Sequence, residues 1–174
     1  LNAVDDILID LIGFVAGARN RTYETHPPHS EEKRTAILVP CWQEHAVIGR
    51  MIQQNIDAIV YENYDIFIGT YPNDHATIDV VRGLAARFPR VHYAIGDRDG
   101  PTSKADCLNW TWRAAVRHER ATGVRYEIIV THDAEDVIHP QSLRWLNHHV
   151  CRYAMIQVPV LPLATPVQKW THGV

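Results

Sequence analysis

The sequence predicts an α/β fold with a mostly parallel central sheet and helices on both faces. Two observations point to it: short, β-branched apolar segments alternate with longer segments of helical period, and polar residues follow each apolar segment. Strands that alternate with helices of this length are typical of parallel sheets whose crossover helices cover both faces. With 174 residues the chain is long enough for one domain with a sizeable core.

The elements follow one another regularly. We predict strands over residues 35–40, 64–72, 91–96, 126–132 and 153–163, and helices over residues 44–60, 76–88, 103–123 and 140–151. Gly123 is expected to end the third helix, and Pro140 to lie in the first turn of the fourth. The prolines of the last strand indicate the edge of a sheet.

A shorter segment precedes this domain. Residues 1–24 predict an amphipathic helix, because Ile7, Leu8, Leu11 and Ile12 share one stripe. Its apolar stretch is too short for a membrane span, so it lies either on the domain or on a membrane surface. Residues 25–34 are expected to be a linker and residues 35–174 the main domain. The chain itself is expected to be an excerpt of a longer protein.

Composition excludes some classes of function. Hydrophobic residues make up 46% and charged residues 21%, and a net charge of −3 leaves no large basic surface for nucleic acid. Among 11 histidines only His148 and His149 are adjacent, which indicates no metal-binding tract. The three cysteines are interpreted as small buried hydrophobes in a reducing compartment.

The candidate site lies at the ends of the strands. In parallel sheets ligands bind outside the carboxyl ends, so residues that follow different strands meet at one edge. The candidates are Pro40, Cys41 and Glu44 after the first strand, Asn73 and Asp74 after the second, Lys104 after the third, and Asp133, Glu135 and Asp136 after the fourth.

Asp133 and Glu135 are the strongest of these candidates. They are two positions apart at a strand end, so both carboxylates can face one hard cation, and Mg²⁺ is commonly held by one or two carboxylates plus substrate phosphates. Lys104 adds a charge that suits phosphate. Ordinary structural interpretations stay open: a solvated turn, a helix cap at Asp74 or Asp136, and a surface charge at Lys104.

The order of motifs over residues 35–163 resembles the family-2 inverting glycosyltransferases, which have the GT-A nucleotide-sugar-binding fold. "ILVPCWQE" is similar to the end of that family's first strand, and "IGTYPNDHAT" to its second acidic motif. "SKADCLN" resembles its K-A-x-x-L-N segment. "THDAEDVIHPQSL" resembles its metal-binding D-A-D-D motif, with Glu135 in place of the second aspartate.

The resemblance implies a role for each residue. The backbone of Pro40 and Cys41 and the side chain of Glu44 are expected to border the nucleotide, and Asn73 or Asp74 to meet a uracil-like base. Lys104 is expected near the diphosphate, Asp133 at the ribose or the metal, and Glu135 at Mg²⁺ or Mn²⁺. The donor is then a nucleoside diphosphate sugar such as a UDP-sugar, the acceptor an unknown glycan or lipid-linked molecule, and the catalytic base an acidic residue beyond Val174.

More narrowly, "DDILIDLIGFV", "YPND" and "HDAEDVIHP" resemble a membrane-anchored bacterial branch of this family. That branch implies a full-length protein at the cytoplasmic face of the inner membrane, anchored through segments outside this chain. Three alternatives stay open. A sugar nucleotidyltransferase is disfavoured because the first strand lacks a glycine-rich loop, and a metal-dependent hydrolase using His132, Asp133 and His139 lacks a supporting spacing. A receptor or scaffold domain of the same fold is the non-enzymatic alternative.

Overall fold

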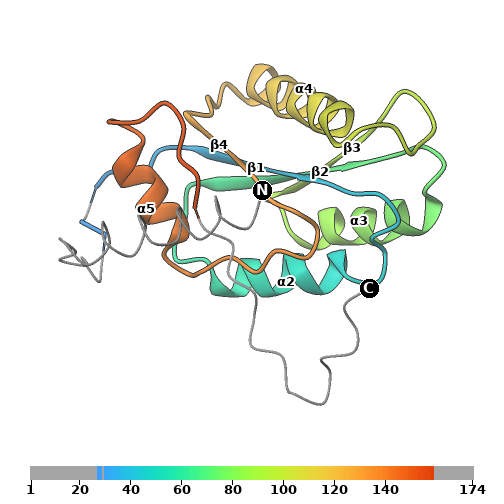
Figure 1. Cartoon of the computed structure of the whole chain (residues 1–174), viewed down its shortest axis with the longest axis horizontal. Coiled ribbons are helices and arrows are strands. Elements are labelled where there is room, and N and C mark those ends of the chain that lie inside the picture. Colours follow the sequence, from blue (N-terminus) through green and yellow to red (C-terminus); the bar gives the residue numbers. More distant parts are fainter. Residues whose placement is uncertain (1–26, 29, 159–174) are drawn as a thin grey trace, which may run out of the picture.

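The computed structural model describes residues 27, 28 and 30–158 and has an α/β architecture (Figure 1). Its elements are β1 (Thr35–Pro40), α2 (Ile48–Ala58), β2 (Tyr64–Thr70), α3 (His75–Arg87), β3 (Val91–Ile95), α4 (Lys104–Thr122), β4 (Ile128–Thr131) and α5 (Ser142–His149). The strands form a parallel sheet in the order β3-β2-β1-β4. This confirms the predicted fold class. The predicted helix over residues 1–24 lies outside the described residues.

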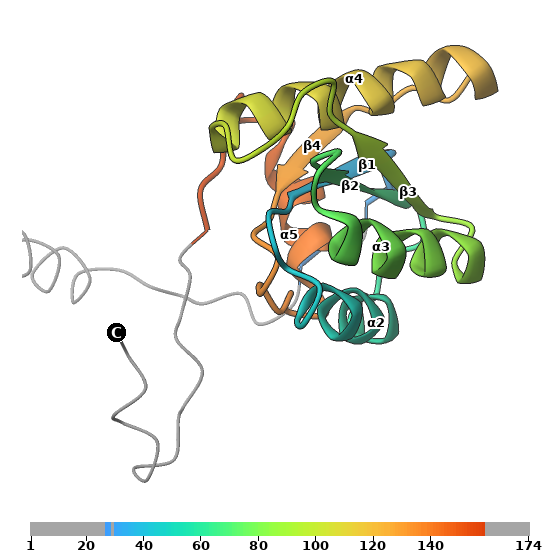
Figure 2. The same cartoon turned by 90° about the vertical axis from the view of Figure 1, so that its right-hand side faces the viewer.

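The helices cover both faces of the sheet. Seen along the layers, α4 lies on one face and α2 and α3 on the other (Figure 2). Helix α5 contributes Leu143 and Leu146 to the same hydrophobic cluster as α2 and α3. The larger part of the core therefore lies beneath the sheet in Figure 1, between these three helices and the strands.

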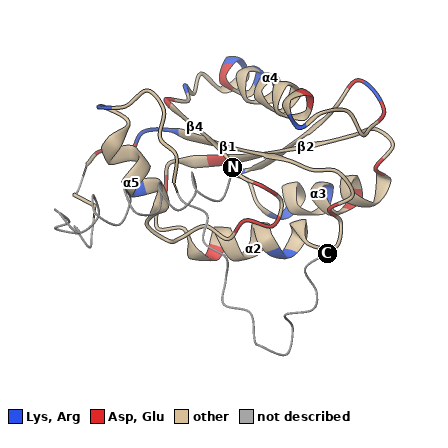
Figure 3. Cartoon of the chain, viewed as in Figure 1, with Lys and Arg blue, Asp and Glu red and all other residues tan. Residues whose placement is uncertain are grey.

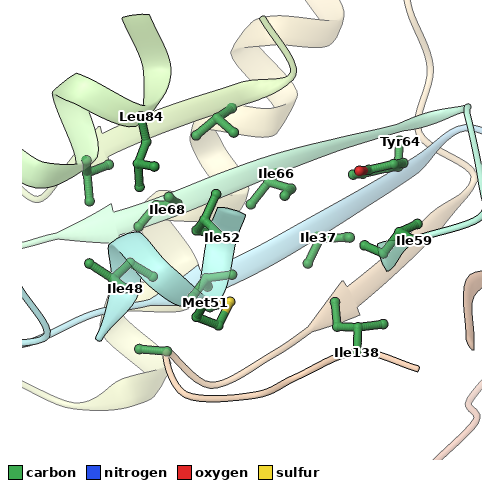
Figure 4. Packing of buried hydrophobic residues seen from close by; sticks show 14 of the residues in the cluster. Ile37, Ile48, Met51, Ile52, Ile59, Tyr64, Ile66, Ile68, Leu84 and Ile138 are labelled. Carbon is green, nitrogen blue, oxygen red and sulfur yellow. The ribbon is translucent and has the colours of Figure 1, made fainter. Parts of the chain in front are cut away.

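Strand β1 shows why these runs are almost continuously apolar. Ala36 and Leu38 pack in the cluster on the α4 side, whereas Ile37 and Val39 pack in the opposite cluster. Because successive side chains point to opposite faces, a strand covered on both sides needs an apolar residue at every position. Figure 4 shows Ile37 facing the side chains of α2.

Local chemistry sets the helix ends. Ser103 caps α4 by accepting a hydrogen bond from the Asp106 N–H, and Gly123 ends the helix as predicted, with a φ of 74°. Helix α5 begins at Ser142, later than predicted. The carbonyl of Pro140 instead accepts a hydrogen bond from the Val60 N–H, which ties the approach to α5 to the end of α2.

Two further predictions are wrong within the described residues. Residues 153–158 form no strand, and Tyr153 and Met155 are 56% and 84% exposed, so their apolar pattern does not mark a buried face. The rest of that predicted strand lies outside the described residues. Cys41 and Cys107 are buried as expected, but Cys151 is exposed.

Residues before β1 contact the domain directly. The Tyr61 hydroxyl donates to the Lys33 carbonyl at 2.6 Å, and a Glu32 carboxylate oxygen accepts from the Glu62 N–H at 2.8 Å. The division into helix, linker and domain stays a prediction, because part of residues 25–34 lies outside the described chain.

Charged residues are distributed over loops and helices of the described chain, with acidic and basic residues interspersed (Figure 3). In the same part of the chain, none of the helices combines the length and apolar character that crossing a membrane requires.

Candidate functional site

A pocket of about 410 Å³ lies at the carboxyl edge of the sheet. The strand order reverses direction at β1, which pairs with β2 on one side and β4 on the other. Loops that leave two such neighbouring strands in different directions open a crevice, and ligands of open α/β sheets bind there. The lining residues are Pro40, Cys41, Trp42, Glu44, Tyr71, Pro101, Thr102, Lys104, Cys107, Asp133, Ala134 and Glu135.

The pocket contains most of the residues that the sequence singled out. Pro40, Cys41 and Glu44 come from the end of β1, and Lys104 is the first residue of α4. Asp133 and Glu135 come from the loop after β4. Asn73 and Asp74 are not in the lining.

Lys104 and Asp133 form an ion pair across the pocket, from the Lys104 ammonium to Asp133 Oδ1. Both side chains are about half exposed, so the pair contributes little to the stability of the fold. Its position matters for ligand binding, because it places the ammonium group of Lys104 and the carboxylate of Asp133 together in the lining of one pocket. Lys104 begins α4, which follows β3, and Asp133 follows β4. These two strands lie at opposite edges of the sheet, and α4 connects them across it.

Asp136 shapes the loop that carries these carboxylates. Its Oδ2 accepts a hydrogen bond of 2.9 Å from the Asp133 N–H and lies 3.4 Å from His132 Nδ1. Asp136 therefore closes the turn after β4. The alternative that it caps the following helix is wrong, because α5 has Gln141 at its N-cap position.

The pocket is electronegative. The pKa of Glu44 is raised, first by burial and then by the negative charges of Glu135, Asp74 and Asp133. Carboxylates that disfavour each other's ionisation in this way gain free energy when a cation enters among them. Burial also raises the pKa of the Cys41 and Cys107 thiols, so neither is a ready nucleophile.

Asp74 supports the loop that lines the pocket after β1. The residue is only 6% exposed, and its carboxylate accepts hydrogen bonds from the Thr77 N–H at 3.3 Å and from the Gln43 N–H at 2.6 Å. The first contact caps α3, an alternative that the sequence left open. The second holds Gln43, whose φ of 59° is unusual for a residue other than glycine. Its predicted contact with a nucleotide base stays a prediction.

Asn73 links two loops at the same edge. Its side chain donates to the Gly100 carbonyl at 2.8 Å and accepts from the Gly100 N–H at 2.9 Å. The loop after β2 is thereby fastened to the loop after β3, which contributes Pro101 and Thr102 to the pocket. A base contact by Asn73 likewise stays a prediction.

The aromatic wall of the pocket was not predicted. Tyr71 packs edge-on against Trp42 and Trp110, with ring centroids 5.1 Å apart in each pair. Gly100 lies against the same ring, and a Cβ there would come within 2.3 Å of it. Trp42 follows the first predicted strand, so its position at a strand end could have marked it as a site residue. Tyr71 falls inside the predicted second strand, where an aromatic residue is usually part of the core.

The arrangement suits a ligand that is partly anionic and partly aromatic. Carboxylates can hold a hard cation, which in turn neutralises phosphate oxygens. Lys104 and the first turn of α4 favour anions. Trp42 also lines the pocket and offers apolar surface, whereas Tyr71 is only 4% exposed and supports the Trp42 ring edge-on. A nucleoside diphosphate has these features.

Two curated relatives match nearly the whole chain. It is 41% identical over 181 residues to bacteriophage adsorption protein B of Escherichia coli strain K12, and equally to bacteriophage N4 adsorption protein B of Escherichia coli O157:H7. In each comparison 99% of this chain is covered but only 24% of the relative. The chain thus spans about a quarter of the length of these relatives, and the expected resemblance to this branch is confirmed.

A solved structure shares the fold. The mannosyltransferase PcManGT from Pyrobaculum calidifontis, in complex with GDP-Man and Mn²⁺, superposes with a TM-score of 0.59 over 80% of this chain and 39% of its own, at 19% identity. The expected GT-A fold is thereby confirmed. The model of the family described as glycosyltransferase like family 2 matches residues 33–170, which include every residue of the pocket. The chain therefore belongs to the family-2 glycosyltransferases and carries the glycosyltransferase domain of that family.

Proposed function

We propose that the pocket binds a nucleoside diphosphate sugar together with Mg²⁺ or Mn²⁺, as the donor half of an inverting glycosyl transfer. One observation carries this proposal: Glu44, Asp133 and Glu135 gather around a 410 Å³ pocket with Lys104 at its mouth. Membership of the family supports the ligand class, as does the complex of the structural neighbour PcManGT with GDP-Man and Mn²⁺.

The side chains that could hold the metal fit a hard cation. They are carboxylates, which Mg²⁺ and Mn²⁺ prefer as ligands. In this proposal Asp133 and Glu135 hold the ion, which supplies charge neutralisation at the diphosphate. Burial, and then the charges of Glu135, Asp74 and Asp133, raise the pKa of Glu44, which contributes to the same negative potential. Lys104 releases Asp133 and contacts a phosphate oxygen instead.

The chemistry divides between two sides of the site. The acceptor hydroxyl attacks the anomeric carbon of the sugar, the bond from that carbon to the phosphate oxygen breaks, and the hydroxyl proton passes to a base. The residues of this pocket stabilise the departing diphosphate. We propose that the base comes from beyond Val174, so residues 1–174 alone bind donor but transfer sugar poorly.

The experiment that tests the ligand is calorimetric titration of the chain with UDP and GDP and with their sugars, in Mn²⁺ or in EDTA. We expect at least about tenfold tighter nucleotide binding with Mn²⁺, a difference of about 1.4 kcal/mol. Glu135→Gln should remove most of this difference, whereas the exposed Asp79→Asn should keep it. Equal affinity with and without metal would contradict the proposal. The nucleotide that binds tighter identifies the donor base.

A second function is favoured by the relatives. Both are named for bacteriophage adsorption, so this domain is alternatively a non-catalytic part of a membrane-associated receptor that retains nucleotide binding. A protein that extends beyond Val174 separates the two. Acceptor-dependent release of nucleoside diphosphate supports transfer, whereas binding without turnover over a broad acceptor panel supports the receptor.

A further inference from the structure

A second cluster of ligating side chains lies at the opposite edge of the sheet. Asp65 is the second residue of β2, His92 the second of β3, and His118 lies in the last turns of α4. One ligand atom from each lies within 4.8 Å of the others, and the described residues contain no other cluster of this kind. Asp65 lies near the start of β2 and Tyr71 just after its end, so about 20 Å separates this cluster from the pocket.

Three elements and a ring stack hold the cluster in place. The Asp65 side chain is 5% exposed and that of His92 27% exposed, so both lie under the cover of α4. The His92 and His118 rings are 4.4 Å apart, and Phe67 stacks on His92 with a centroid distance of 4.8 Å. Both histidines are partly buried, and rings packed in this way lose little freedom on binding an ion, which is the preorganisation a metal site needs.

The two oxygens of Asp65 have different surroundings. Arg34 and the Tyr126 hydroxyl both donate to Oδ2, the latter at 2.6 Å. Oδ1 faces His92 Nε2 at 3.5 Å. Tetrahedral ligands about 2.0–2.1 Å from an ion lie roughly 3.3 Å from one another, so this pair already has the required separation. A ligand atom of His118 lies within 4.8 Å of both, so the third group comes from α4.

The outer contacts also resemble those of metal ligands. The Tyr126 hydroxyl lies 2.9 Å from His118 Nδ1 while it donates to Asp65, so one hydroxyl links two of the three groups. Such partners orient histidine and carboxylate ligands in metal sites.

We propose that Asp65, His92 and His118 form a binding site for a borderline divalent transition ion such as Zn²⁺, which fastens β2, β3 and α4 together. Two imidazoles and one carboxylate suit Zn²⁺ or Co²⁺, whereas an oxygen-only set suits Mg²⁺. The site is separate from the carboxylates of the pocket and differs from them in ligand type. Metal binding at Asp65, His92 and His118 does not require a nucleotide sugar in the pocket.

The test is titration of the chain with Co²⁺, followed by its visible absorption, and with Zn²⁺, followed by calorimetry. We expect one equivalent of Co²⁺ to bind and to show the intense visible bands of a tetrahedral or five-coordinate ion. Zn²⁺ should displace the bound Co²⁺, and it should raise the Tm of the metal-free protein. His92→Gln and His118→Gln should each weaken binding at least about tenfold. The double change His148→Gln and His149→Gln is the matched control and should leave binding unchanged.

Two results would overturn the proposal: unchanged binding in the first two variants, or loss of the bands in the control, which would mean adventitious binding by adjacent histidines. The unaltered chain gives a readout that does not require the variants to fold. X-ray absorption of its Zn²⁺ complex should show two imidazoles with oxygen ligands, and sulfur ligation or one imidazole alone would contradict the site.

Discussion

The Asp74 carboxylate joins the loop after β1 to the start of α3, because its Oδ2 accepts a 2.6 Å hydrogen bond from the Gln43 N–H while Oδ1 accepts one from Thr77. Gln43 has a positive φ, and this contact offsets part of the cost of that conformation. A buried carboxylate beside the pocket thus fixes the backbone that carries Cys41 and Glu44. The relationship leads to the first prediction.

Asp74→Ala should lower the free energy of unfolding by about 1–2 kcal/mol, since it removes a helix cap and an acceptor for the Gln43 N–H. It should also weaken nucleotide binding, because the loop loses its support. Urea unfolding and calorimetry measure the two effects. Asp79→Ala, at an exposed position of the same helix, should change stability by less than about 0.5 kcal/mol. Similar losses in both variants would exclude the positioning role.

Lys104→Ala should weaken binding of a nucleoside diphosphate about tenfold and binding of the nucleoside much less, because only the diphosphate carries the anion that Lys104 contacts. Calorimetric titration with UDP and with uridine measures both. Arg113→Ala removes an exposed cation farther along α4 and should leave both affinities unchanged. If Lys104→Ala weakens both ligands equally, the lysine acts by shaping the pocket.

Asn73→Ala should loosen the loop of residues 96–103, because both hydrogen bonds to Gly100 are lost. We expect faster proteolytic cleavage within this loop and a nucleotide affinity a few-fold lower. Limited proteolysis with mass spectrometry locates the cut. Asn73→Asp keeps the acceptor for the Gly100 N–H but not the donor, so its cleavage rate should be intermediate. An unchanged cleavage pattern in Asn73→Ala would show that the loop has other support.

Gly69→Ala should destabilise the fold by at least about 1–3 kcal/mol, since its Cβ would lie 2.0 Å from Thr111 Oγ1 and 2.9 Å from Cys107 Sγ. The strand and α4 must then move apart, and the pocket lining at Cys107 moves with them. Gly83→Ala is the matched control: its Cβ meets nothing within 4 Å, and alanine in a helix should add about 0.5–1 kcal/mol. Thermal unfolding of both variants checks the opposite signs.

The strands and the candidate site were readable from the sequence for a physical reason. A parallel sheet covered on both faces requires uninterrupted apolar runs, so β1 was predicted at its observed bounds, residues 35–40. Ligands bind where such strands end, so Glu44, Lys104, Asp133 and Glu135 could be named as candidates from the sequence, and all four line the pocket. The start of α2 was predicted four residues early because residues 44–47 form turns although their composition suits a helix.

By itself the sequence determined the α/β class, the strand-end residues and the family, since these depend on local period and on motifs along the chain. Only the tertiary structure decided that Asp74 supports the loop at Gln43, that Tyr71 forms a wall of the pocket, and that Lys104 pairs with Asp133. It also brought Asp65 beside His92, 27 residues away, and His118 beside both. Such contacts depend on strand order and on how α4 packs across the sheet, and no local pattern of residues encodes either.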